Sequence, residues 1–213
     1  MALNLETTVS AENFLPPRKT LSTLASAAQQ CRGCELYRNA TQAVFGVGKR
    51  DAPLMLVGEQ PGDHEDQLGQ PFVGPAGQLL DKALAAAGIA RDAVYVTNAV
   101  KHFKWEPRGK RRLHTKPSER EIAACHPWLR EELRLVAPRL VVCLGVSAAR
   151  AVLNRAITIS RVRGTILEAA ENQPTLVTTH PSALLRLRES AERDAAFKAL
   201  VADLDTAAKF AAQ

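Results

Sequence analysis

The fold is decided by the stretch LMLVGEQPG at residues 54–62. Its first four residues form an apolar run that ends at Gly58, which is typical of a buried strand. The same pattern recurs as VYVT at 94–97, LVVCL at 140–144 and LVTT at 176–179. We therefore expect four buried strands, each followed by a glycine or a polar residue.

Helical segments separate these strands. We expect helices over residues 21–29, 76–87, 119–136, 147–153 and 189–212. Ser118 and Glu121 have the spacing of a capping box at the start of the third helix. Residues 59–74 and 101–118 are expected to be loops. Strands that alternate with helices form βαβ units, so the pattern predicts an α/β fold with a central four-stranded parallel sheet.

Length and composition agree with one globular domain. The chain has 213 residues, of which 46% are hydrophobic and 23% are charged, and this balance excludes a disordered or collagen-like protein. We expect a flexible N-terminal arm over residues 1–20 and one domain over residues 21–213. No apolar run approaches the roughly 20 residues of a membrane span, and residues 1–20 lack the apolar core of a signal peptide. We therefore expect an intracellular protein that does not enter a membrane.

The positive charge is concentrated in one segment. The formal net charge is +6, and residues 101–120 alone carry eight basic and two acidic side chains. This segment therefore accounts for the whole excess, which indicates a polyanionic partner at that place. The alternative is a basic loop that is merely solvated.

Polar residues follow the predicted strands at their carboxyl ends. They are the segment 58–62, Asn98, Gly145 and the segment 180–182. In parallel α/β sheets ligands bind at this edge. The sequence therefore predicts a functional site there.

Two motifs associated with other enzyme classes are excluded. A Walker A loop at residues 43–50 would need Gly at position 43 and Ser or Thr at position 50, where the chain has Ala43 and Arg50. A nucleophile elbow at residues 144–149 lacks its second glycine.

The cysteines suggest a metal or cluster site. The chain has four: Cys31, Cys34, Cys125 and Cys143. Cys143 lies in a predicted strand and is expected to act as a small apolar residue. Cys31 and Cys34 form a C-x-x-C pair, Cys125 is the obvious third ligand, and either His102 or His126 could be the fourth. This set could bind zinc or an iron–sulfur cluster, and the alternative is three unrelated buried cysteines.

Several longer motifs resemble one enzyme family. The segments GEQPGDHED (58–66) and GQPFVGPAGQLL (69–80), together with TNAVK (97–101) and HPS (180–182), resemble the iron–sulfur uracil-DNA glycosylases of family four. The segment GKRRLH (109–114) looks like the extra loop of the UdgX subgroup, whose histidine bonds covalently to DNA after uracil is excised. Gln60 and His102 also look like residues of that subgroup.

The resemblance implies a fold and a cofactor. It implies a three-layer αβα domain and a [4Fe–4S] cluster held by Cys31, Cys34, Cys125 and a fourth group. Ordinary family-four enzymes have a cysteine where this chain has His102, so His102 is the expected fourth ligand.

Each site residue then has an expected role. The Asn98 amide can donate to O4 and accept from N3–H of uracil, and Phe72 can stack on the extruded base. His180 can stabilise the leaving uracil anion, and Glu59 can stabilise the sugar cation, position a water or orient an imidazole. The His114 imidazole is the expected nucleophile toward the sugar. Further contacts with the base are expected from Gly58 and Gln60, and contacts with DNA from Lys110, Arg111, Arg112 and Ser182.

The expected function is uracil excision from DNA, in repair, by an enzyme that then stays attached to the sugar through His114 and acts once. One alternative is an ordinary family-four glycosylase that releases an abasic site and turns over. A second is a metal-containing protein that only binds nucleic acid. We expect a monomer in the bacterial cytoplasm, near the nucleoid, acting on uracil in single-stranded or double-stranded DNA.

Overall fold

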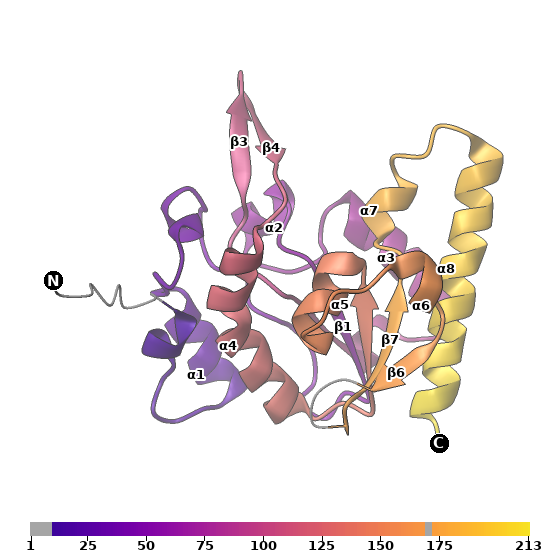
Figure 1. The fold of residues 1–213 in the computed structure, drawn as a ribbon, viewed down its shortest axis with the longest axis horizontal. Coiled ribbons are helices and arrows are strands. Elements are labelled where there is room, and N and C mark those ends of the chain that lie inside the picture. The colour runs from indigo at the N-terminus through magenta and orange to yellow at the C-terminus, as the bar shows by residue number, and fades with distance from the viewer. Residues whose placement is uncertain (1–9, 169–171) are drawn as a thin grey trace, which may run out of the picture.

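The computed structural model describes residues 10–168 and 172–213, which form the predicted α/β architecture (Figure 1). The central sheet has the strand order β2-β1-β5-β7-β6. Its parallel strands are β1 (Leu54–Gly58), β2 (Val94–Asn98), β5 (Leu140–Leu144) and β7 (Pro174–Thr178). The four-stranded parallel core is therefore confirmed.

A fifth strand at one edge was not predicted. β6 (Ile166–Glu168) pairs with β7 in the antiparallel direction. It is three residues long, and both Ile166 and Glu168 are exposed. So short a strand has no apolar run, and only its pairing with β7 identifies it.

Two segments expected to be loops contain regular structure. Residues 59–74 include the short helix α2 (Asp63–Leu68), which ends at Gly69 with a φ of 71°. Within residues 101–118, the strands β3 (Trp105–Arg108) and β4 (Arg111–His114) form an antiparallel hairpin. Its two-residue turn contains Gly109 at a φ of 58°, a conformation that hairpin turns require and that glycine adopts without strain. Figure 1 shows the hairpin standing out from the sheet.

Helices cover both faces of the sheet, so the expected three layers are present. α3 (Pro75–Ala86) and α8 (Ser190–Ala211) pack on one face, whereas α4 (Glu119–Val136) and α5 (Val146–Leu153) pack on the other. In β1, Leu54 and Leu56 face the first layer, and Met55 and Val57 face the second. This alternation follows from the two-residue period of a strand.

The smaller helices complete the domain. They are α1 (Leu21–Ala28), α6 (Ile159–Val162), α7 (Pro181–Leu184) and the 3₁₀ helices Ala11–Phe14, Glu35–Arg38 and Arg91–Ala93. In the part of the chain that the structure describes, no helix combines the length and the apolar character needed to cross a bilayer.

Part of the expected N-terminal arm packs against the domain. Ala11 is fully buried in a cluster with Leu24 and Trp128. Glu12 pairs with Arg130 of α4, at 2.9 Å. The start of the described chain therefore buries apolar surface against α4. Residues 1–9 lie outside the described residues.

A buried ion pair joins α4 to the end of β2. The Nζ of Lys101 lies 2.5 Å from Oε2 of Glu132, and both side chains are fully excluded from solvent. Lys101 also donates to Oγ1 of Thr97 and to the backbone oxygen of Asn98, both at 2.7 Å. Glu132 further accepts from the Tyr95 hydroxyl at 2.9 Å. Both charges are thus paired and hydrogen-bonded, which a buried ion pair needs to be tolerated.

Replacing one partner should therefore be costly. We predict that Glu132→Ala lowers the free energy of unfolding by about 3–5 kcal/mol, since it leaves the Lys101 ammonium buried without a counterion. The measurement is urea unfolding followed by circular dichroism. Arg130→Ala breaks the exposed pair with Glu12 and should cost less than about 1 kcal/mol. Equal losses in the two variants would contradict this interpretation.

Candidate active site

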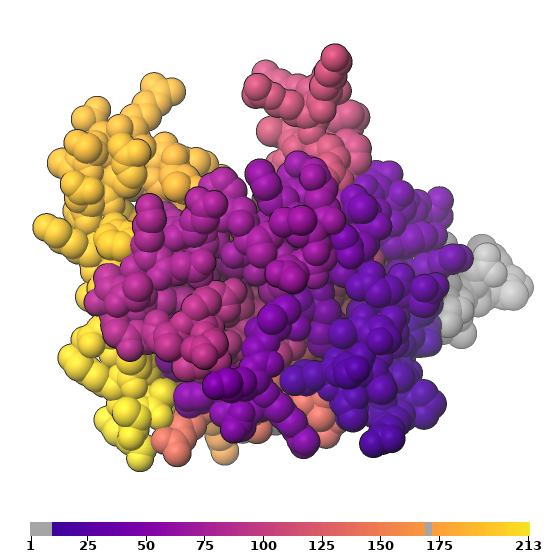
Figure 2. Space-filling view, turned by 180° about the vertical axis from the view of Figure 1, so that it is seen from behind, coloured from indigo at the N-terminus to yellow at the C-terminus, as the bar shows by residue number. Residues whose placement is uncertain are grey.

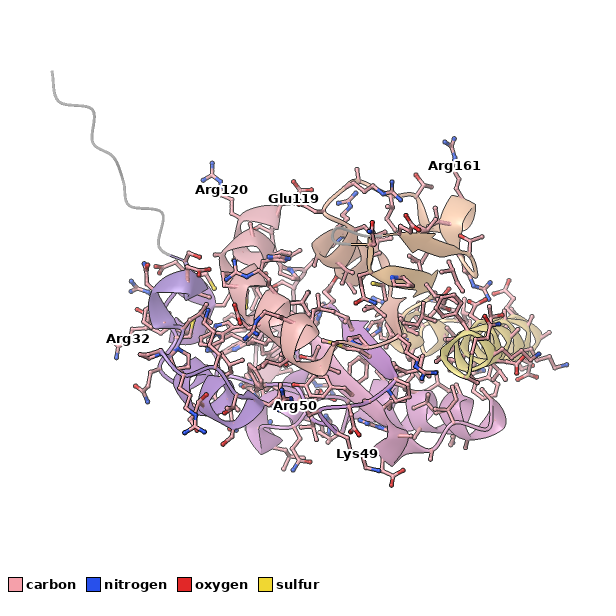
Figure 3. The ribbon with its side chains drawn as sticks, turned by 90° about the horizontal axis from the view of Figure 1, so that it is seen from below. Arg32, Lys49, Arg50, Glu119, Arg120 and Arg161 are labelled. Atoms are coloured by element: carbon pink, nitrogen blue, oxygen red, sulfur yellow. The ribbon has the colours of Figure 1, made fainter. Side chains whose placement is uncertain are left out.

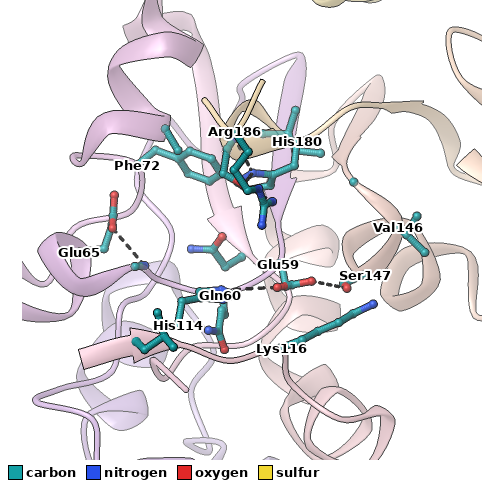
Figure 4. Close-up of a pocket in the computed structure, with 17 residues that line it drawn as sticks. Glu59, Gln60, Glu65, Phe72, His114, Lys116, Val146, Ser147, His180 and Arg186 are labelled. Carbon is teal, nitrogen blue, oxygen red and sulfur yellow. Dashed lines mark hydrogen bonds and ion pairs between the residues drawn. The ribbon is translucent and has the colours of Figure 1, made fainter. Parts of the chain in front are cut away.

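The main cavity lies at the carboxyl ends of the parallel strands, as predicted. It has a volume of about 730 Å³. The β3–β4 hairpin and the α7–α8 segment rise on either side of a depression at this edge (Figure 2). Figure 4 shows side chains from both walls and from the strand ends pointing into the cavity. The predicted residues that line it are Glu59, Gln60, Phe72, Asn98, His114, His180 and Ser182.

Glu59 and His114 meet inside the cavity, although they come from different elements. Glu59 follows β1, and His114 is the last residue of β4. The Glu59 Oε1 and His114 Nε2 atoms are 3.6 Å apart. The second Glu59 oxygen, Oε2, accepts a hydrogen bond from the hydroxyl of Ser147. The carboxylate therefore lies between an imidazole and a serine.

The His180 imidazole is held in one tautomer. The backbone N–H of Ser182 donates to Nδ1 of His180 at 3.1 Å. In the neutral ring the proton must then be on Nε2. Burial, together with the charges of Arg186 and His114, lowers the pKa of His180 to about 4. At neutral pH the ring is uncharged and offers one N–H donor.

Asn98 presents an unpaired acceptor at the base of the cavity. Its Oδ1 atom is buried and has no hydrogen-bond partner among the described residues. A buried polar atom without a partner is costly, so a ligand donor would be favoured here. A Cβ at Gly58 would lie 2.3 Å from this oxygen and 2.6 Å from the Phe72 ring. Gly58 was expected to contact a base, but its observed effect is to leave room for these two side chains.

Phe72 is held in a strained backbone conformation. Its φ is 57°, which costs a non-glycine residue of order 1–2 kcal/mol. The Glu65 carboxylate holds the chain on both sides of Phe72. It accepts hydrogen bonds from the backbone N–H groups of Gly62, at 3.0 Å, and Gly74, at 2.7 Å. The Phe72 ring lies 5.9 Å from the His180 ring, between centroids, with the planes tilted by 31°. The two rings therefore form neighbouring parts of one wall.

Gln60 is engaged with the hairpin. Its Nε2 donates to the backbone oxygens of Lys104 and Thr115, at 3.1 and 3.2 Å, and its Oε1 accepts from the Lys104 N–H at 3.2 Å. These residues lie at the two ends of the hairpin. Gln60 was expected to contact the base, but its side chain is used to hold the segment that carries His114.

Arg112 was expected to contact DNA, but in this structure its side chain is engaged by groups of the protein. Its guanidinium pairs with Asp63 at 2.5 Å and with Asp66 at 2.6 Å. It also lies over the rings of Phe103 and Trp105, 5.5 Å from each centroid. The hydrogen bonds to two carboxylates use the donors that a phosphate would need. Arg112 instead fastens the hairpin to α2.

Other cations remain exposed around the hairpin. Lys110 and Arg111 are exposed at its tip, and Lys116 is exposed at the cavity. Arg120 extends away from the start of α4 (Figure 3). Some basic residues of the segment 101–120 are therefore paired with carboxylates of the protein, whereas others are exposed and can contact a polyanion.

Several residues that line the cavity were not predicted, among them Ser147, Arg186 and Lys116. Ser147 and Arg186 follow strands β5 and β7 at short distances, and Lys116 lies just after the hairpin. Each lies in a segment expected to be an ordinary loop or helix. The strand-end rule gives the edge of the sheet, but it does not give the side chains that turn back toward it.

Three cysteines gather near α4. Cys31 and Cys125 belong to one buried cluster, and Cys34 packs against it. Two of the sulfurs accept an N–H: Cys31 from the Trp128 indole and Cys125 from the Lys101 backbone, both at 3.3 Å. Burial raises the pKa of Cys34, and it raises that of Cys125 to about 12.

These observations fit an iron–sulfur cluster. Hydrogen bonds to sulfur are typical of ligating thiolates, and a cationic cluster would stabilise the thiolate form that burial disfavours. No three His, Cys, Asp or Glu side chains within residues 10–168 and 172–213 converge closely enough to hold a single metal ion. A cluster is larger than one ion, so its ligands stand further apart. Cys143 is buried in β5, as expected of a small apolar residue.

His102, the expected fourth ligand, is also buried. Only 5% of its surface is exposed. Burial lowers its pKa to about 4, and the nearby charge of Asp66 opposes this shift. The ring is neutral at pH 7, which is the form that binds metals.

Comparison with known proteins gives one consistent result. Residues 45–205 match the model of the uracil DNA glycosylase superfamily. A type-4 uracil-DNA glycosylase of Archaeoglobus fulgidus is 36% identical over 186 residues, covering 83% of this chain and 90% of the relative. A type-4 enzyme of Thermotoga maritima is 34% identical over 188 residues, covering 88% and 92%. A type-5 uracil-DNA glycosylase of Pyrobaculum aerophilum is 37% identical over 154 residues, covering 64% of each chain.

The anchoring of the hairpin can be tested without a substrate. We predict that Arg112→Ala increases amide hydrogen exchange of residues 105–114 at least about tenfold, because local opening no longer breaks two ion pairs. The measurement is exchange followed by mass spectrometry. Arg111→Ala, which changes the adjacent exposed arginine, should leave exchange unaltered. Similar exchange in Arg112→Ala and the parent protein would contradict the anchoring role.

Proposed function

This chain belongs to the uracil DNA glycosylase superfamily, and on that premise we propose that it excises uracil from DNA and is then captured on the sugar by His114. It has the type-4 enzymes among its relatives, which supports excision. Capture by His114 is a further step, and it is argued below from the contacts of that residue.

The observation that carries the proposal is the unpaired Oδ1 of Asn98. N3–H of uracil is a donor that can satisfy this oxygen, while the amide nitrogen can donate to O4. Cytosine has an acceptor at N3 and would leave the oxygen unpaired. A base must leave the DNA stack to reach such a site, and the Phe72 ring beside the cavity provides a surface on which it can stack.

The cavity also supports bond cleavage. When the bond between C1′ and N1 breaks, its electron pair leaves with uracil, and the sugar becomes cationic. The uncharged His180 ring can donate its Nε2–H to O2 of the leaving anion. Glu59 is a carboxylate in the same cavity, and its charge favours the sugar cation.

His114 competes with water for that cation. Its ring lies next to Glu59, so the nitrogen that carries the proton can face the carboxylate while the lone pair of the other attacks C1′. The new N–C bond makes the ring cationic until its proton passes to Glu59 or to solvent. To break the new bond, the His114 ring would have to leave C1′, and once it has lost its proton it is a poor leaving group. The enzyme should therefore act once.

The exposed cations suggest where DNA runs. Lys110, Arg111 and Lys116 lie on the hairpin side of the cavity, and Arg186 lies on the opposite side. Arg186 donates to the Ser182 hydroxyl at 3.3 Å. A strand that follows the depression in Figure 2 would have cations on both sides.

We further propose a [4Fe–4S] cluster held by Cys31, Cys34, Cys125 and His102. Such a cluster would cross-link the N-terminal segment, α4 and the end of β2. Its contribution here is structural, since metal binding energy is also folding energy.

The reading of uracil by Asn98 is testable. We predict that Asn98→Asp lowers the ratio of uracil to cytosine excision at least about tenfold, because a carboxylate cannot donate to O4. The measurement is single-turnover base release from labelled oligonucleotides. Asn39→Asp makes the same change on an exposed residue and should leave the ratio unaltered. An unchanged ratio in Asn98→Asp would remove this residue from base recognition.

The cluster ligands are testable by metal content. Cys31→Ala, Cys34→Ala and Cys125→Ala should each lose iron and lower the melting temperature, since a ligand is missing. Cys143→Ala is the matched control and should retain iron. The measurement is iron per chain in purified protein. Equal iron content in all four variants would overturn the assignment.

The fate of the product decides between capture and turnover. We predict that the parent protein forms an adduct with uracil-containing DNA that survives SDS and heat, and forms none with thymine-containing DNA. His114→Ser should lose the adduct and still release uracil, because Asn98 and His180 remain. His64→Ser, which changes an exposed histidine, should keep the adduct.

Other outcomes of the same assay identify the alternatives. Many turnovers with release of abasic DNA would indicate an ordinary glycosylase. Binding of DNA without release of any uracil would indicate a protein that only binds nucleic acid. An adduct that persists without His114 would assign capture to another residue.

A further inference from the structure

Ser147 occupies the serine position of the incomplete nucleophile-elbow motif at residues 144–149, which lacks its second glycine. The chain leaves β5 at Gly145, whose φ of 90° turns it sharply into α5. A Cβ at Gly145 would also approach the His180 Cβ to 3.2 Å. This turn brings Ser147, on the first turn of α5, to the cavity next to the end of β1.

Ser147 does not face the cavity as a free nucleophile. Its hydroxyl donates a hydrogen bond to Oε2 of Glu59, and only 3% of its surface is exposed. Glu59 is more accessible, with 22% of its side chain exposed. Any effect of Ser147 on a substrate must therefore pass through Glu59. Figure 4 shows the carboxylate between this serine and His114.

We propose that Ser147 is a positioning residue that orients Glu59 toward His114 and thereby directs the sugar cation to histidine rather than to water. This inference rests on the proposed capture by His114. It adds a residue whose effect on the fate of the sugar cation passes through Glu59.

The argument is one of geometry and charge. The terminal torsion of a glutamate is broad, so an unrestrained carboxylate samples many orientations. The hydrogen bond from Ser147 fixes one oxygen and leaves Oε1 facing Nε2 of His114, at 3.6 Å. As the imidazole attacks C1′, its positive charge develops next to this oxygen and is stabilised. A carboxylate that turns away would lose this effect and could instead bind and activate a water.

The test measures how the product divides between two fates. Parent protein and Ser147→Ala are mixed in excess with a labelled uracil-containing oligonucleotide, and SDS-resistant adduct and free abasic DNA are quantified. We expect the ratio of adduct to abasic DNA to fall at least about tenfold in Ser147→Ala. Thr175→Val, which removes another buried hydroxyl away from the cavity, should keep the parent ratio. A merely structural loss would lower both products together.

A double-mutant cycle tests whether Ser147 acts through Glu59. In a Glu59→Ala background, adding Ser147→Ala should change the ratio less than about twofold, because the coupled partner is already gone. An undiminished effect in that background would overturn the proposal, as would an unchanged ratio in Ser147→Ala alone. If the parent protein forms no adduct, capture by His114 fails first, and the positioning role falls with it.

Discussion

The ion pair between Lys101 and Glu132 holds together the parts on which the site depends. The Lys101 ammonium group donates to the Glu132 carboxylate and to the backbone oxygen of Asn98. The backbone N–H of Lys101 donates to the sulfur of Cys125. One residue thus connects the end of β2, helix α4 and a thiol of the proposed cluster. A buried ion pair adds little net stability compared with apolar packing, but any conformation that leaves either charge buried without its partner is strongly destabilised. The relative position of Asn98 and α4 is therefore strongly specified.

The site combines a rigid sheet edge with an added hairpin. Asn98 ends β2, Glu59 follows β1, and His180 lies just beyond β7. These are parallel strands of one sheet, so the spacing of the three residues is set by strand pairing. His114 is carried on a two-stranded hairpin, which is marginally stable alone. Arg112 and Gln60 fix this hairpin by contacts with α2 and with both of its ends. Two residues expected to touch the substrate thus hold His114, the proposed nucleophile, in place.

The charge of the hairpin segment has two uses. Its concentration of basic residues predicted a polyanion partner, and Lys110, Arg111 and Lys116 remain exposed for that purpose. Lys101 and Arg112 instead satisfy buried or partly buried carboxylates. A count of charges cannot separate these groups, because the carboxylates that pair with them are distant in sequence.

The sequence by itself determined the four parallel strands, the helices between them and the edge at which the site lies. These features depend on local periods and on residues adjacent to each strand, such as Asn98 and His180. It also singled out His114 and the cysteines by their motifs. The sequence alone could not determine that β6 joins the sheet, that Arg112 pairs with Asp63 and Asp66, or that Ser147 donates a hydrogen bond to Glu59. β6 lies close to β7 along the chain, but its three residues are too few to show an apolar run. The contacts of Arg112 and Ser147 join segments far apart along the chain, 88 residues in the case of Ser147 and Glu59, and such contacts exist only once the sheet has brought its strand ends together.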